Sequence, residues 1–153
     1  MISHTYTLDM SDKKHLEKVI NALGFVADFL NKSQIPWLLG ASGALMVHGV
    51  DVIPYDLDIF VSKADVIKIE KLLNKYIKNP LHDFTDQTGA YIECQLLINN
   101  IEVEILELDE LGHPQPVNFH GHTVYVNSLA HELEEYKKKP DKKEIVQLIE
   151  KLI

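Results

Sequence analysis

Apolar residues recur every three or four positions in several segments of the chain, and this spacing predicts helices. The four long segments cover residues 11–31, 62–78, 128–138 and 141–153, and a shorter apolar helix is expected at 44–48. Ser11 is placed to cap the first of them. Asp141 and Glu144 have the spacing of a capping box at the start of the last one.

Short apolar or alternating runs predict five strands, at residues 37–39, 56–61, 90–98, 101–106 and 122–126. Asn99 and Asn100 join two of them as a hairpin, because Asn tolerates the left-handed backbone of a tight turn. The order of helices and strands predicts one α/β or α+β domain over residues 1–153. Its parts are an N-terminal helix (1–33), a sheet core (35–127) and C-terminal helices (128–153).

Composition and net charge limit the classes of protein to which the chain could belong. Of the 153 residues, 46% are hydrophobic and 25% are charged, as in ordinary globular domains. We see no apolar run long enough for a membrane span and no secretory leader, so a cytoplasmic protein is predicted, with Cys94 unpaired. The formal net charge of −8 disfavours a general nucleic-acid coat protein. All 15 positive charges are lysines, so any phosphate must be held by lysine, backbone N–H groups or metal.

The segment that carries chemistry is the acidic strand at 56–61. Asp56 and Asp58 are two residues apart and therefore project from the same face of the strand, about 7 Å apart. Two such carboxylates repel each other unless they share a cation, and Mg²⁺ prefers hard carboxylate oxygens. The alternative is that both simply face solvent.

A third carboxylate would complete a metal site. Glu102 and Glu104 alternate with Ile101, Val103 and Ile105, so both lie on one face of their strand. Glu104 lies deeper in the strand than Glu102, which is next to the hairpin turn. Glu104 is therefore the preferred candidate.

Small residues form a second feature near the acidic strand. Gly40, Ala41 and Ser42 follow the strand at 37–39 and precede a short helix. Small residues at such a turn allow the backbone to approach a phosphate, and Ser42 offers a hydroxyl. Tight packing is the alternative explanation of the same turn.

These segments together resemble a known family. The runs LLGASGALMVHGV, YDLDIFV and INNIEVEIL resemble the nucleotidyltransferase superfamily (DNA polymerase β-like), in particular its minimal bacterial members. Its pattern is an apolar residue, Gly, then Gly or Ser, a spacer and an Asp-x-Asp/Glu strand. Ser42 and Asp56 are separated by 13 residues, which fits that spacer. The resemblance covers roughly residues 35–152.

The resemblance implies a mixed sheet flanked by helices, and a metal-dependent transfer of an NMP group from an NTP to a hydroxyl acceptor. It assigns Mg²⁺ or Mn²⁺ to Asp56, Asp58 and Glu104. It assigns the phosphates to Gly40, Ala41, Ser42 and Lys138. ATP is the first candidate for the NTP, the acceptor is a small molecule, tRNA or a protein, and a homo-oligomer is expected.

Three departures favour a different reading. Ala41 occupies the position of the family's central Gly, and Val52 and Pro54 stand where many relatives have Arg and Thr. They are typical of a weak or inactive nucleotidyltransferase-fold binding module, for example one partner of a toxin–antitoxin pair.

Two further clusters allow other ligands. His113, His120 and His122 offer imidazoles to a transition metal, although no cysteine lies nearby in the sequence. Five lysines between residues 137 and 143 would attract RNA if they do not simply face solvent near a helix end.

Overall fold

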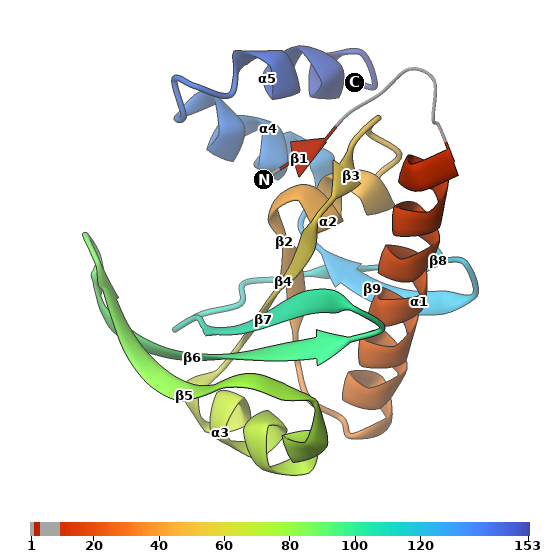
Figure 1. The fold of residues 1–153 in the computed structure, drawn as a ribbon. Coiled ribbons are helices and arrows are strands. Elements are labelled where there is room, and N and C mark those ends of the chain that lie inside the picture. The colour runs from red at the N-terminus through yellow and green to blue at the C-terminus, as the bar shows by residue number, and fades with distance from the viewer. Residues whose placement is uncertain (1, 4–9) are drawn as a thin grey trace.

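The computed structural model describes residues 2–3 and 10–153, and a seven-stranded mixed sheet forms its centre (Figure 1). Its strands are β2 (Leu38–Gly40), β4 (Asp56–Val61), β5 (Ile77–Asp86), β6 (Gly89–Ile98), β7 (Ile101–Glu107), β8 (Gln115–Phe119) and β9 (His122–Val126). Their spatial order is β5-β6-β7-β4-β2-β9-β8. The β4–β7 and β2–β9 pairs are parallel, and the other pairs are antiparallel. A separate two-stranded sheet joins β1 (Ile2–Ser3) to β3 (Ile53–Pro54).

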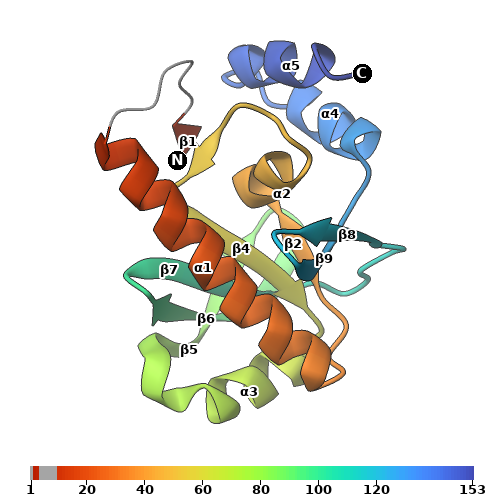
Figure 2. The ribbon, with the colours of Figure 1, turned by 90° about the vertical axis from the view of Figure 1, so that its right-hand side faces the viewer.

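Two helices cover one face of the seven-stranded sheet (Figure 2). Helix α1 (Met10–Lys32) contacts β4, β7 and β9, and α3 (Lys63–Leu72) contacts β5, β6 and β7. On β4, the side chains of Leu57, Ile59 and Val61 are fully buried in the resulting core. The alternate residues of β4 therefore lie on the opposite face, which is where Asp56 and Asp58 are found.

The C-terminal helices pack at one end of the sheet. Helices α4 (Leu129–Lys137) and α5 (Lys143–Glu150) lie above it in Figures 1 and 2. They share a second hydrophobic cluster with residues from α2 (Ala41–Val47) and the segment after it. That cluster contains Leu45, Val50, Val52, Tyr136, Ile145, Leu148 and Ile149. It places α4 beside α2, and therefore beside the end of β2.

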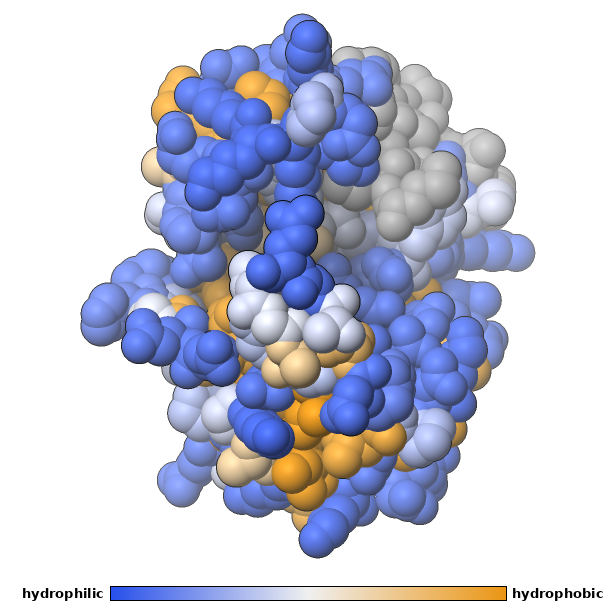
Figure 3. Space-filling view, turned by 90° about the vertical axis from the view of Figure 1, so that its left-hand side faces the viewer, coloured by the Kyte–Doolittle hydropathy of each residue, from blue (hydrophilic) through white to orange (hydrophobic). Residues whose placement is uncertain are grey.

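On the face of the molecule that Figure 3 shows, the upper part is largely hydrophilic, whereas hydrophobic side chains gather in the lower part. None of the helices in the described ranges is both long and apolar enough to cross a membrane.

Several predictions from the pattern are confirmed. Strands β4 and β9 have the predicted bounds, and β6 and β7 form the predicted hairpin. Asn99 and Asn100 have φ angles of 53° and 63°, so both adopt the left-handed conformation that the turn requires. The helix predicted over 128–138 forms as α4, and the structure adds that Ser128 caps it by accepting a hydrogen bond from the backbone N–H of His131.

The helix predicted over 62–78 is wrong in its second half. Helix α3 ends at Leu72, a 3-10 turn (η1, Asn74–Tyr76) follows, and β5 then runs along the edge of the sheet. The helical spacing of apolar residues continues to Ile77, but pairing of β5 with β6 uses the backbone groups that a longer helix would need. Pro80 is tolerated because β5 is an edge strand.

Other boundaries also differ from the predictions. Residues 115–119, which lie outside the predicted strands, form the opposite edge strand β8, which tolerates Pro116 for the same reason. Ser11 lies inside α1, since the helix begins at Met10. The predicted capping box is not formed, because α5 begins at Lys143 and its N-cap residue is Lys142, with no side-chain capping hydrogen bond.

Candidate metal and nucleotide site

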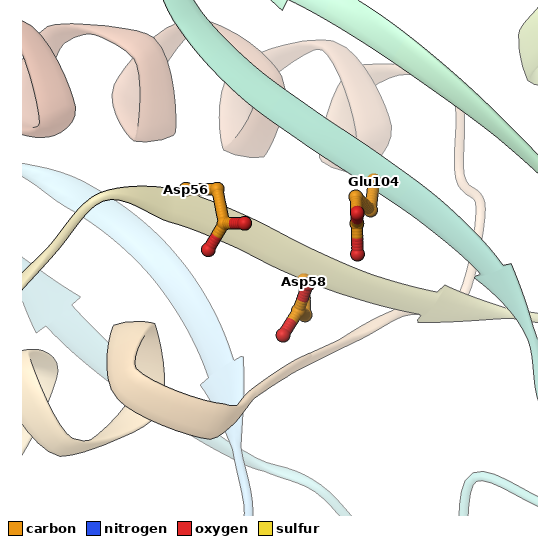
Figure 4. Close-up of side chains that lie close together, drawn as sticks. All are labelled: Asp56, Asp58 and Glu104. Carbon is orange, nitrogen blue, oxygen red and sulfur yellow. The ribbon is translucent and has the colours of Figure 1, made fainter. Parts of the chain in front are cut away.

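Pairing of β4 with β7 brings the three predicted acids together. In the parallel register, Asp56 lies opposite Glu102 and Asp58 opposite Glu104. One carboxylate oxygen from each of Asp56, Asp58 and Glu104 lies within 4.8 Å of the others (Figure 4). All three side chains are half-buried. In the part of the chain that the structure describes, this is the one group of three or more acids, histidines or cysteines close enough to hold a metal ion together.

The two candidate glutamates have different partners. The Glu102 carboxylate forms an ion pair with Lys78, with an Oε1–Nζ distance of 3.3 Å. Glu104 forms no ion pair among the described residues and instead faces Asp58 across the strand pair. The geometry therefore groups Glu104, not Glu102, with the two aspartates.

When no cation is present, the surroundings of Asp56 and Asp58 disfavour ionisation of their carboxyl groups. Burial raises the pKa of the Asp58 carboxyl from its ordinary value of 3.8 to about 8, and a hydrogen bond and negative charge from Glu104 add to this rise. Burial also raises the pKa of Asp56, and the charges of Glu104 and Glu102 contribute. A bound divalent cation would offset both the desolvation and the repulsion.

A pocket of about 160 Å³ opens beside the aspartates. Its lining residues are Ala41, Ser42, Asp56, Asp58, Tyr136, Lys139 and Lys142. Gly40 lies behind this wall, paired with Asp58, and a Cβ atom there would come within 2.6 Å of the Phe60 ring. Glycine is therefore required at residue 40 by packing. The turn predicted at 40–43 is already helical from Ala41 onward.

Two buried hydroxyl groups in this pocket lack partners. Ser42 is 5% exposed and Tyr136 is 3% exposed, and neither hydroxyl has a hydrogen-bond partner among the residues described. Burial, followed by the charges of Glu132 and Asp58, raises the pKa of Tyr136 to about 12, so its hydroxyl remains a proton donor at neutral pH. Buried polar groups normally find partners, so these two indicate room for a polar ligand.

The lysines near the pocket are not the one predicted from sequence. Lys138 is 71% exposed, its Nζ lies 3.3 Å from Glu135 Oε1, and it does not line the pocket. Lys139 and Lys142 line it, and neither has an ion-pair partner in the described part of the chain. The Lys139 Nζ lies 4.8 Å from the centroid of the Tyr136 ring.

Tyr136 was not predicted, and Lys139 and Lys142 were considered only as part of a lysine cluster for RNA or solvent, because these residues approach the acids only through tertiary packing. Helical spacing in α4 and α5 shows which residues face a core. It does not show that the α4–α5 turn lines the same pocket as the aspartates of β4.

The histidines expected as an alternative metal site do not converge. The His122 ring packs against Gly24, and its Nδ1 atom lies 2.8 Å from Asp28 Oδ1. The His120 ring packs against Phe119, with a centroid distance of 4.5 Å. With His113 they form no metal-binding group within residues 10–153.

The fold of the chain is similar to those of two solved proteins, although no protein-family model and no curated protein sequence matches the chain. The crystal structure of a proposed nucleotidyltransferase, TM1012 from Thermotoga maritima, matches with a TM-score of 0.68 and 20% sequence identity over 98% of each chain. The lincosamide antibiotic adenylyltransferase LnuA, in its lincomycin-bound crystal structure, matches with a TM-score of 0.62 and 10% identity. That match covers 87% of this chain and 97% of LnuA. Over nearly its whole length, the chain therefore has a nucleotidyltransferase-like fold.

Proposed function

We propose that the protein is a metal-dependent nucleotidyltransferase that moves an NMP group from an NTP, with ATP the first candidate, to a hydroxyl acceptor. The observation that carries the proposal is the group formed by Asp56, Asp58 and Glu104 beside a polar pocket. Within a nucleotidyltransferase-like fold, these three carboxylates can bind the divalent metal that such a transfer uses.

The donor set fits Mg²⁺ or Mn²⁺. Carboxylate oxygens are hard ligands, and three of them leave coordination positions open for phosphate oxygens. Burial, and to a lesser degree the negative charge of neighbouring acids, raises the pKa values of Asp56 and Asp58, and a bound cation would offset both effects. When bound, such a metal supplies charge neutralisation at the phosphates and lowers the pKa of an acceptor hydroxyl.

The pocket supplies groups suited to a polyphosphate. Ser42 and Tyr136 can donate hydrogen bonds, and Lys139 and Lys142 can approach phosphate oxygens as unpaired cations. The charge distribution supports this assignment. Before Lys137 the chain has 9 lysines against 20 acidic residues, and from Lys137 onward it has 6 lysines against 3 acidic residues.

The transfer itself would exchange a phosphoanhydride bond of the NTP for a phosphoester bond to the acceptor. An acceptor hydroxyl oxygen would attack the α-phosphorus and release its proton to solvent, while the bond from that phosphorus to the bridging oxygen breaks and pyrophosphate leaves. Asp56 and Asp58 line the pocket together with Lys139 and Lys142, whereas Glu104 does not line it, so we assign Glu104 to the acceptor side of the reaction.

The alternative is a module that binds nucleotide without turnover. Val52, at the position where many relatives have arginine, is buried in the second hydrophobic cluster, and no arginine occurs elsewhere in the chain. A guanidinium clamp on the nucleotide is therefore absent, and lysine holds phosphate less directionally.

The test compares two isosteric changes on one strand. We expect Glu104→Gln to weaken Mn²⁺-dependent binding of a non-hydrolysable ATP analogue, measured by calorimetry, and to abolish pyrophosphate release with a panel of hydroxyl acceptors. Glu102→Gln, two residues away, should leave both within about twofold of wild type. Binding without pyrophosphate release would favour the non-catalytic module. No binding of any NTP by the wild-type protein would refute both.

A further inference from the structure

A chain of side-chain hydrogen bonds leads from the edge of the sheet to Glu104. Gln95 on β6 lies directly opposite Glu104 on β7. The Gln95 Nε2 atom donates a hydrogen bond of 3.0 Å to Glu104 Oε1. On the other side of β6, Asn79 on β5 lies opposite Gln95, and its Nδ2 atom donates a hydrogen bond of 2.8 Å to Gln95 Oε1.

The direction of these bonds fixes the orientation of the Gln95 amide. An amide side chain has one accepting and one donating end. Because the Asn79 donor occupies the accepting end of Gln95, the donating end must face Glu104. The bond from Asn79 and the accepting carboxylate of Glu104 therefore favour the same orientation, in which the amide N–H of Gln95, and not its oxygen, faces Glu104.

The neighbouring pair shows the alternative way of holding a glutamate. Lys78, one residue before Asn79, forms an ion pair with Glu102 at 3.3 Å. That contact offsets the negative charge of Glu102. Gln95 is neutral, so it orients Glu104 and leaves its charge, and one of its two oxygens, for a cation.

We propose that Gln95, oriented by Asn79, is a positioning residue that holds Glu104 ready for a divalent metal. The inference rests on the proposed function, because it assigns a purpose to Glu104 as a metal ligand. Hydrogen bonds from outer residues to metal ligands orient them, and their loss typically lowers metal affinity by about 10–100-fold.

Binding of Mn²⁺ alone, followed by the electron paramagnetic resonance signal of the free ion, tests the proposal without relying on turnover. Gln95→Met removes the donor at similar length, and we expect Mn²⁺ affinity to fall by about tenfold or more. Gln95→Lys restores a donor but adds a charge. We expect it to keep the thermal stability of the wild type and still to bind Mn²⁺ more weakly. A role limited to stabilising the hairpin would instead leave Mn²⁺ affinity unchanged in both variants.

Two further variants complete the experiment. Asn79→Ala, at an exposed position, should weaken Mn²⁺ binding by a few fold, and it keeps the test valid if Gln95→Met fails to fold. Lys78→Met is the matched control, expected to bind Mn²⁺ as the wild type does, because it removes only the partner of Glu102.

The possible failures are distinguishable. If Glu104→Gln weakens Mn²⁺ binding while the Gln95 and Asn79 variants stay within twofold of wild type, the positioning role is overturned and the proposed function stands. If the wild-type protein binds no Mn²⁺, the proposed function and the positioning role both fail.

Discussion

Ala41 has a backbone conformation that glycine adopts more readily. Its φ angle is 52°, in the left-handed region, at the point where β2 passes into α2. An alanine in this region costs about 1–2 kcal/mol relative to ordinary backbone. Ala41 stands where the family that the sequence resembles has its central glycine, so the backbone conformation gives a physical reason for a glycine at such a position.

Ala41→Gly should therefore stabilise the protein. Relief of the left-handed conformation is partly offset by the greater freedom of glycine in the unfolded chain, which leaves a gain of about 0.5–1 kcal/mol in the free energy of unfolding, measured in urea. The same change at Ala44, inside α2, is the control and should destabilise by about 1 kcal/mol or more. A loss of stability for Ala41→Gly would contradict this explanation.

In the metal-free protein, ionisation of the Asp58 carboxyl should lower the free energy of unfolding as pH rises. Its pKa is about 8 in the fold and 3.8 ordinarily, so the unfolded chain ionises first, and stability falls between about pH 4 and pH 8. Asp58→Asn removes this cost. In EDTA at pH 8 we expect its Tm to exceed that of wild type by at least about 3 °C, since 1 kcal/mol corresponds to about 2–4 °C at this size.

The same variant should lose its response to metal. Mn²⁺ should raise the Tm of the wild-type protein and leave that of Asp58→Asn unchanged, because the variant lacks a charged ligand. At pH 4 in EDTA the two proteins should have equal Tm values. Asp51→Asn, at an exposed position, should behave as wild type throughout. A lower Tm for Asp58→Asn at pH 8 in EDTA would show that its carboxylate stabilises the fold.

The turn between α4 and α5 brings lysines to the aspartates, and single substitutions separate their roles. Lys139→Gln or Lys142→Gln should weaken binding of an ATP analogue in saturating Mg²⁺ by about tenfold, the loss of one charge-assisted hydrogen bond. Lys138→Gln should change it less than twofold, because Lys138 pairs with Glu135 outside the pocket. A larger effect at Lys138 than at Lys139 would show that the turn rearranges when nucleotide binds.

Sequence patterns failed to predict strands that form only by pairing with an adjacent strand. The spacing of apolar residues in α3 continues into η1 and β5, and only pairing with β6 makes residues 77–86 a strand. The two strands of the seven-stranded sheet that were not predicted, β5 and β8, lie at its edges. Edge strands bury less apolar surface, so their patterns are weak.

Charge is unevenly distributed over the molecule, and this distribution predicts how salt changes the affinity for nucleotide. The net charge of −8 repels a triphosphate, whereas the lysines of the α4–α5 turn attract it at short range. At 0.1 M salt, interactions between charges more than about 10 Å apart are largely screened, so the near lysines should dominate over dispersed acids. In saturating Mg²⁺, affinity for an ATP analogue should therefore fall as KCl rises. An increase in affinity with KCl would show that the overall negative charge dominates.

Local patterns were sufficient for the helix periodicity, the β6–β7 hairpin and the alternation that sets Asp56 and Asp58 on one face of β4, because each depends on residues close together in the chain. Depth in the strand favoured Glu104 over Glu102, but it was the parallel pairing of β4 with β7 that set Glu104 against Asp58. Tertiary structure alone placed Tyr136, Lys139 and Lys142 in the pocket and Lys138 outside it. Contacts between residues some 80 positions apart depend on how whole elements pack, and no local periodicity encodes that packing.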